Sequence, residues 1–220
     1  MGFAIIATGN EKSAFKAENV LHMFPTCVWR VQFEPEVARA VNDRALAAIE
    51  AMRREEPVYP LDQPWQSRQD IHLHPEFRDL VSLIEDAAKN ALGYLKVADC
   101  AFQFTGGWVN MGPPGAAHKM HSHANNFLSC VYYIRTGPGN NTITFHDPRY
   151  QNQVVIPVIT ERTVENAETV NLGVEEGTLL LFPSWLPHSV DPNTSDQMRI
   201  SVSFNMMFSR FAETMAQPNW

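Results

Sequence analysis

Eight short segments rich in β-branched and aromatic residues fill roughly the last 120 residues and constrain the fold more than any other feature. They follow Ala98 and read CAFQFTGGWVNM, HKMHSH, FLSCVYYI, NTITFH, QVVIPV, ETVNL, TLLLF and RISVSFNMMF. Gly, Pro, Asn and Asp lie in the gaps, as they do in turns between strands. Many short strands at this spacing are typical of a jelly-roll sandwich or barrel. We therefore predict a mainly β (α+β) fold with its jelly-roll core over residues 99–210.

The first 98 residues have a different pattern. A β-like run spans 23–33, and helical patterns cover about 36–54 and 75–96, separated by a proline-rich loop. The apolar residues of both helices recur at helical spacing, which predicts that each packs one face on a larger structure. We predict one domain, 1–220, in which the strand and two helices of 1–98 buttress the jelly roll. The same helix stripes would also be compatible with a homodimer.

The amino-acid composition limits the classes of binding partner and the cellular locations that we expect. Asp and Glu exceed Lys and Arg by 24 to 17, for a net charge of −7, which disfavours a general electrostatic grip on nucleic acid or an anionic membrane. No apolar run approaches the roughly 18 residues of a spanning helix, and the N-terminal apolar stretch has no basic region before it, so we expect no secretory signal. Three widely spaced cysteines do not suggest a disulfide framework, and we expect a cytoplasmic protein.

Histidines crowd the second β segment. In HKMHSH, alternation along a strand places His121 and His123 on one face and His118 on the other. Two imidazoles one pleat apart can bind a single metal ion, and His188, after the strand TLLLF, is the best candidate for a third ligand. A solvated loop with unrelated histidines is the alternative.

The last β segment contains an arginine that its alternating pattern can place inside the protein. Ile200, Val202 and Phe204 alternate with Arg199, Ser201 and Ser203, so one face is apolar and the other polar. The polar face either meets solvent or lines a cavity between two sheets. In a cavity the Arg199 guanidinium needs an anionic partner, and a bound carboxylate, with a further bond from Ser201, would supply one.

Four motifs in order carry a resemblance to a known family. WVNMGPPG (108–115), HSHANNFLSCVYYI (121–134), FHDPR (145–149) and FPSWLPHSVDPNTSDQMRISVSFN (182–205) resemble a family of small 2-oxoglutarate/Fe(II)-dependent oxygenases over about residues 108–205. The resemblance implies a double-stranded β-helix, an oxidoreductase activity, Fe(II) as cofactor and 2-oxoglutarate as co-substrate. It implies hydroxylation of a C–H bond coupled to decarboxylation of 2-oxoglutarate.

Site residues follow from the resemblance by position. His121 matches the first metal ligand, His188 the distal ligand and Arg199 the anchor of the far 2-oxoglutarate carboxylate. Ser201 matches the residue beside that anchor, and Asn110 is a candidate hydrogen-bond donor to co-substrate or substrate. No catalytic residue beyond the metal ligands is expected.

One position departs from the wider superfamily. His123 stands where the usual set has a carboxylate, and three imidazoles also suit zinc. Asp147 is an alternative source of a carboxylate, but DPR reads as a turn. Two alternatives therefore stay open: a cupin-like three-histidine metalloprotein (a keto-acid-independent dioxygenase or an isomerase), and a non-catalytic metal-binding module. The substrate, a small molecule or a side chain, is expected to meet loops 55–75 and 135–165. Which of Tyr132 and Tyr133 lines the cavity is left open.

Overall fold

Two antiparallel sheets of unequal size face each other in the computed structural model, which describes residues 4–5, 19–55, 63–98, 101–149, 151 and 154–213. The larger sheet has the strand order β3-β10-β7-β12-β5-β4 and the smaller one β6-β11-β8-β9, while β1 and β2 pair separately. The strands are β1 (Ala4–Ile5), β2 (Asn19–Val20), β3 (Trp29–Gln32), β4 (Trp65–Gln66), β5 (Phe102–Gly112), β6 (His118–His121), β7 (Leu128–Arg135), β8 (Thr142–His146), β9 (Thr169–Gly173), β10 (Thr178–Pro183), β11 (His188–Val190) and β12 (Arg199–Phe208).

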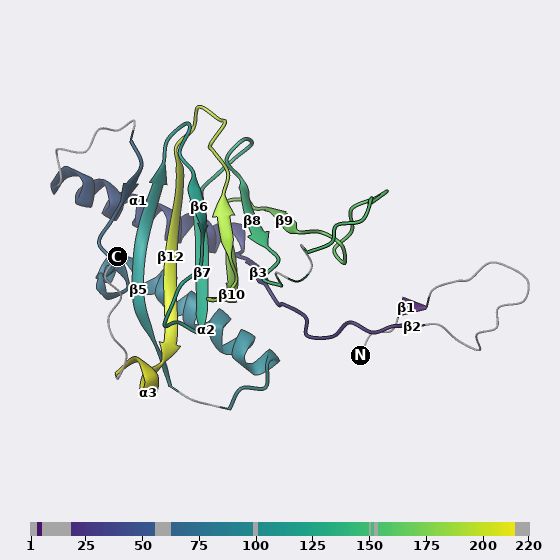
Figure 1. Cartoon of the computed structure of the whole chain (residues 1–220). Coiled ribbons are helices and arrows are strands. Elements are labelled where there is room, and N and C mark those ends of the chain that lie inside the picture. The colour runs from purple at the N-terminus through teal and green to yellow at the C-terminus, as the bar shows by residue number, and fades with distance from the viewer. Residues whose placement is uncertain are drawn as a thin grey trace, which may run out of the picture.

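Two long helices cover the outer face of the larger sheet (Figure 1). They are α1 (Pro35–Glu55) and α2 (Arg78–Tyr94), and α2 is preceded by the 3₁₀ turns η1 (Ile71–Leu73) and η2 (Pro75–Phe77). A short helix, α3 (Ser209–Ala212), follows β12. The helix between 36 and 54 is confirmed almost to the residue. The second helix begins slightly later than expected because Pro75 starts a tighter 3₁₀ turn.

Alternation along β12 divides the interior into two cores. Ile200, Val202 and Phe204 point outward into a core shared with the helices, whose apolar stripes are buried there within the chain. The other parity faces the smaller sheet, across a second core. That core contains Val131, Tyr133, Ile143, Phe145, Val174, Leu180, Phe182 and Leu186.

Three strand predictions need correction. The run 23–33 forms a strand only over Trp29–Gln32. The described part of the QVVIPV segment, 154–158, is no strand: it pairs with nothing in the sheets and belongs to an exposed arm between β8 and β9 (Figure 1). In HKMHSH the strand ends at His121. The eighth strand of the jelly roll is instead β11, which begins at His188 and is not among the eight expected segments.

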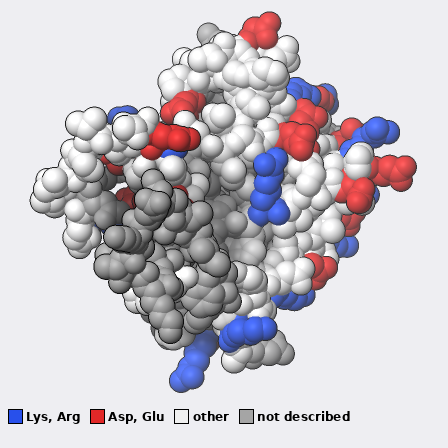
Figure 2. Space-filling view, turned by 90° about the vertical axis from the view of Figure 1, so that its right-hand side faces the viewer, with Lys and Arg blue, Asp and Glu red and all other residues white. Residues whose placement is uncertain are grey.

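Surface charge is mixed on the side of this arm. Figure 2 shows acidic and basic side chains interspersed there, with no continuous basic patch among the residues drawn in colour. None of the described helices combines the length and hydrophobicity that a membrane span requires.

Candidate metal centre

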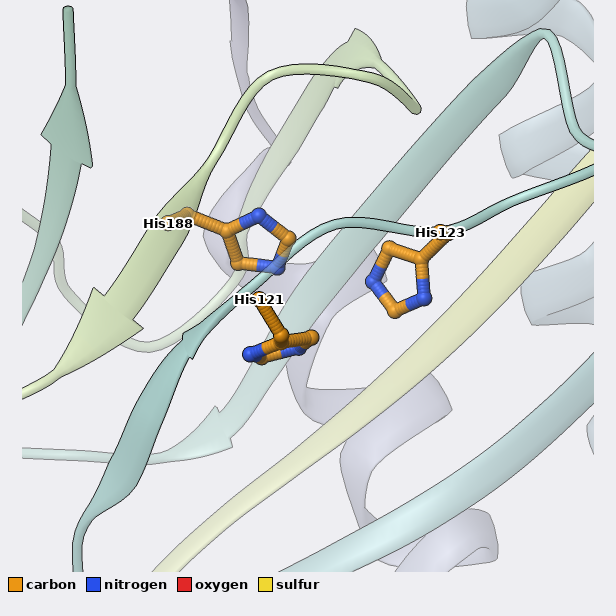
Figure 3. Close-up of side chains that lie close together, drawn as sticks. All are labelled: His121, His123 and His188. Atoms are coloured by element: carbon orange, nitrogen blue, oxygen red, sulfur yellow. The ribbon is translucent and has the colours of Figure 1, made fainter. Parts of the chain in front are cut away.

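Three histidines from separate points in the sequence meet between the two sheets. His121 ends β6, His188 begins β11 opposite it, and His123 lies just beyond β6 (Figure 3). Each offers one nitrogen, and these nitrogens lie within 4.8 Å of one another. Ring centroids are 4.4 Å apart for His121 and His188, and 5.2 Å apart for His123 and His188. One ion held by all three fits this spacing.

Backbone carbonyls orient two of the rings. The Nδ1 atom of His121 lies 2.7 Å from the carbonyl oxygen of Lys119, and that of His188 lies 3.0 Å from the oxygen of Leu186. A carbonyl only accepts, so each Nδ1 carries the hydrogen and each Nε2 keeps a free lone pair. Both rings are therefore in the tautomer that binds a metal ion through Nε2.

Burial keeps two of the three histidines, His123 and His188, uncharged at neutral pH. Desolvation, with smaller contributions from the neighbouring histidines, lowers the pKa of His123 to about 3. Desolvation also lowers the pKa of His188 to about 4, partly offset by its bond to the Leu186 carbonyl. Neutral imidazole is the form that ligates metal. The donor set therefore fits a divalent transition metal.

A cavity of about 360 Å³ opens over the histidines. It runs between the inner faces of the two sheets, and apart from histidine its one charged lining residue among those described is Arg199. Its lining residues are Gln66, Gln69, Trp108, Asn110, His118, His121, Ser122, His123, Cys130, Val131, Ile143, Phe182, His188, Val190, Arg199, Ser201 and Ser203.

Arg199 and Tyr133 form an unsatisfied pair at one end of this space. Arg199 is 7% exposed and Tyr133 is fully buried, with the guanidinium carbon 5.2 Å from the tyrosine ring centroid. Among the described residues, neither the Nε of Arg199 nor the hydroxyl of Tyr133 has a hydrogen-bond partner. Burial raises the pKa of Tyr133 to about 12, against the opposing effect of Arg199, so the hydroxyl stays a donor. Two buried, unpaired donors side by side fit an anionic ligand group.

Polar residues continue from this pair toward the histidines. In the pairing of β12 with β5, Ser201 lies opposite Asn110 and Ser203 opposite Trp108. The Asn110 amide donates to the Ser203 hydroxyl at 3.1 Å. Ser201 is 5% exposed and lies opposite Tyr133 of β7. All three predicted cofactor-binding residues, Asn110, Arg199 and Ser201, thus line the same cavity as the histidines.

The three histidines lie together as expected, but strand alternation is not the reason. Alternation does not reach His123, because the strand has already ended, and His118, expected on the other face, also lines the cavity. A register shift between His188 and Val190 interrupts the regular pairing of β11 with β6.

Two further expectations are settled. Asp147 lies in a turn after β8, where its carboxylate accepts three hydrogen bonds from Arg149, one of them from the backbone N–H, and the three-histidine group among the described residues includes no carboxylate. Of the two tyrosines, Tyr133 faces the smaller sheet, while the Tyr132 hydroxyl donates to Asn42 on α1. The sequence leaves the choice between the two tyrosines open, because the face of each one depends on the strand register.

Fold and site together define a class: a double-stranded β-helix with a metal-binding centre between its sheets. Residues 106–205 match the family described as "Putative 2OG-Fe(II) oxygenase". The family resemblance inferred from the four motifs is thereby confirmed over almost the same span. No curated protein matches the sequence significantly.

Solved structures share this fold at low sequence identity. HygX from Streptomyces hygroscopicus, with nickel and 2-oxoglutarate bound, has a TM-score of 0.59 at 12% identity, over 84% of this chain and 83% of its own. AviO1 from Streptomyces viridochromogenes Tue57 has a TM-score of 0.59 at 14% identity, over 88% of this chain and 93% of its own. A Pseudomonas putida prolyl-4-hydroxylase has a TM-score of 0.54 at 19% identity, over 83% of this chain and 93% of its own. These similarities confirm the double-stranded β-helix.

Proposed function

We propose that this protein is a non-haem Fe(II), 2-oxoglutarate-dependent dioxygenase of the hydroxylase type. The observation that carries the proposal is the buried Arg199, which lines one cavity with the three histidines and has the buried, unpaired hydroxyl of Tyr133 beside it. A keto acid that chelates a metal at one end and carries a carboxylate at the other requires both features. HygX, which shares the fold, was crystallised with nickel and 2-oxoglutarate.

His121, His123 and His188 would hold the iron. Three protein ligands leave coordination positions free for a bidentate co-substrate and dioxygen. Iron bound there would supply oxygen activation: 2-oxoglutarate and O₂ give succinate and CO₂, and the second oxygen atom enters a substrate C–H bond as a hydroxyl. The carbonyls of Lys119 and Leu186 hold two of the rings in place for this task.

Arg199 would bind the far carboxylate of 2-oxoglutarate, with the hydroxyls of Tyr133 and Ser201 beside it. The guanidinium contact is charge-assisted and takes place away from water, which makes it strong. Asn110, oriented by Ser203, would donate a hydrogen bond to the co-substrate or substrate from the facing strand. These side chains fix the direction in which the keto acid enters the cavity.

The three-histidine set also favours a second candidate. Without a carboxylate ligand, the iron keeps one more unit of positive charge than in the usual set, and the site also suits zinc. A cupin-like enzyme that needs no keto acid, or a non-catalytic metal module, would have the same histidines. Neither the keto-acid-independent enzyme nor the metal module requires the unpaired donors of Arg199 and Tyr133, so the oxygenase is favoured.

For the substrate we propose only a general chemical class. We propose a small molecule or a side chain as substrate. The segments 55–75 and 135–165, expected as loops, contain β4, η1 and β8, and their residues Gln66, Gln69 and Ile143 line the cavity that the substrate would enter. The interspersed charges in Figure 2 and the net charge of −7 argue against nucleic acid. The homodimer and the cytoplasmic location stay predictions of the sequence, as does the single domain.

Titration of 2-oxoglutarate into the anaerobic Fe(II) protein tests the function, followed by the metal-to-ligand charge-transfer absorption. We expect the band in wild type, and 30- to several-thousand-fold weaker binding in Arg199→Ala, from a loss of about 2–5 kcal/mol. Arg199→Lys should fall between them, because an ammonium keeps the charge without the planar fork.

Metal content should be the same in all these proteins. Arg30→Ala is the control, since Arg30 lies on edge strand β3 and its nearest acidic partner is Glu175 at the surface. If wild type shows no band, or if Arg199→Ala titrates like wild type, the oxygenase proposal fails and the keto-acid-independent alternative replaces it.

A further inference from the structure

His123 differs from the other two histidines in what meets its second ring nitrogen. Its Nδ1 lies 3.5 Å from the side-chain nitrogen of Asn205, a residue of β12 that is 3% exposed. The other two Nδ1 atoms meet backbone carbonyls, which can only accept. An asparagine amide has one end that donates and one that accepts, so it can hold the ring in either tautomer.

Asn205 belongs to a buried chain of polar side chains. Its Oδ1 accepts a hydrogen bond of 2.7 Å from the Ser129 hydroxyl, which lies 2.8 Å from the hydroxyl of Ser184. Ser129 and Ser184 are 1% and 0% exposed. Hydroxyl hydrogens rotate, so the direction of every bond in this chain can reverse together without loss of a bond. The amide of Asn205 is thus free to turn over.

The orientation seen here does not suit a metal ligand. With the Asn205 nitrogen donating to it, Nδ1 of a neutral His123 is the acceptor and Nε2 carries the hydrogen. Nε2 is the nitrogen that faces the other two imidazoles (Figure 3). A nitrogen that carries a hydrogen has no lone pair for a metal ion. Metal binding therefore requires the hydrogen on Nδ1, opposite an acceptor.

We propose that Asn205 is the positioning residue for His123, and that its amide turns over when the metal site fills. In the filled state Oδ1 accepts from His123 Nδ1–H, the amide nitrogen donates to Ser129, and Ser129 donates to Ser184. This rests on the three-histidine metal site of the proposed function, but not on 2-oxoglutarate or on turnover. Asn205 does for His123 what the carbonyls of Lys119 and Leu186 do for His121 and His188.

Affinity for Zn²⁺, measured by competition with a chelator, separates this role from simple packing. Asn205→Leu keeps the volume but removes the acceptor, and we expect about 10- to 100-fold weaker binding. Asn205→Asp keeps only acceptor oxygens, and we expect Zn²⁺ binding at least as tight as wild type. If Asn205 acts as a donor or a spacer, the aspartate will bind as weakly as the leucine, and the proposal is wrong.

Asn42→Leu is the matched control. Asn42 is also buried and hydrogen-bonded, to Tyr132 and the Ile134 carbonyl, but on the helix-covered side of the sheet. Its loss should lower thermal stability without changing Zn²⁺ affinity. Should a position-205 variant fail to fold, long-range ¹H–¹⁵N spectra of wild type decide instead: His123 should change from Nε2–H to Nδ1–H when Zn²⁺ is added.

Failure of the oxygenase proposal is distinguishable from failure of this one. A protein that binds Zn²⁺ with the expected order of variants, yet shows no charge-transfer band with Fe(II) and 2-oxoglutarate, keeps the role of Asn205 and loses the oxygenase. A wild type that binds no Zn²⁺ overturns the role of Asn205 as well. An Nδ1–H tautomer already present before Zn²⁺ is added overturns the turning of the amide.

Discussion

At the scale of single residues, the charge of the proposed iron site depends on His123, which by the family resemblance stands where the wider superfamily has a carboxylate. We expect His123→Asp to retain Fe(II) and to raise the decarboxylation of 2-oxoglutarate, since the variant has the two-histidine, one-carboxylate set. Iron affinity and succinate release measure this. His118→Asp is the control, a nearby cavity histidine outside the cluster. Equal iron affinity and equal succinate release in wild type and His123→Asp would remove His123 from the ligand set.

The distal ligand is tested separately. His188 is 5% exposed and central to the cluster, so His188→Ala should lose most of the bound transition metal because only two ligands remain. Metal analysis after dialysis gives the result. His146→Ala serves for comparison, since His146 lies on the next strand and contacts the Ser189 hydroxyl at 2.9 Å. Metal content undiminished in His188→Ala would contradict the assigned site.

At the scale of elements, the close contact between β5 and β12 depends on a glycine. A Cβ on Gly107 would lie 2.5 Å from the ring of Phe204, which is fully buried, whereas a Cβ on Gly106 would meet its nearest neighbour, Gln69, at 3.5 Å. We expect Gly107→Ala to lower the free energy of unfolding by about 1–3 kcal/mol through overpacking, and Gly106→Ala to change it far less. Urea denaturation of both proteins measures the difference. Equal stabilities would mean that the Phe204 ring moves aside at no cost.

Elements with their own periodicity could be predicted from sequence, and those that depend on a partner could not. The helix at 36–54 and the alternation of Arg199, Ser201 and Ser203 are local patterns, and both are confirmed. The run at 154–158 has the composition of a strand but no strand beside it, and composition does not reveal a missing partner. The end of β6 at His121 is equally non-local, because it depends on pairing with β11.

The candidate site residues also divide into those that the sequence alone could predict and those that depend on strand pairing. The histidines and Arg199 were predictable because few residue types do their chemistry. Tyr133 was not, since its neighbour Tyr132 is chemically identical and only the register of β7 against β12 decides which one faces Arg199. Trp185 is 55% exposed on the loop before His188, which its aromatic side chain alone does not predict. Asn205 reads from sequence as one more polar residue on an alternating strand.

At the scale of the whole molecule, the buried histidines link stability to pH. The pKa values of His123 and His188, about 3 and about 4, lie below the ordinary 6.5, so between these limits the unfolded chain binds more protons than the folded one. The free energy of unfolding of metal-free protein should therefore fall as pH drops below 6.5. At pH 5 the loss relative to pH 7.5 should be about 2 kcal/mol per histidine.

Chemical denaturation of the metal-free protein at the two pH values measures this linkage. The double variant with glutamine at both positions, His123→Gln and His188→Gln, is the reference, because it has neither titrating group. Its stability should change less between pH 7.5 and pH 5 than that of wild type. The same pH dependence in both proteins would assign it to other groups.

The place of β6 at the edge of the smaller sheet has a consequence for how fast an ion is exchanged. All four of its residues are exposed, β11 is its one neighbour among the described strands, and it carries His121, with His123 just beyond its end. An edge strand can detach while the rest of the molecule stays folded. An ion held by the three histidines would then be loaded and released at the rate of this local opening, without global denaturation. The metal would be a kinetically labile component of an otherwise persistent structure, replenished from the surrounding pool.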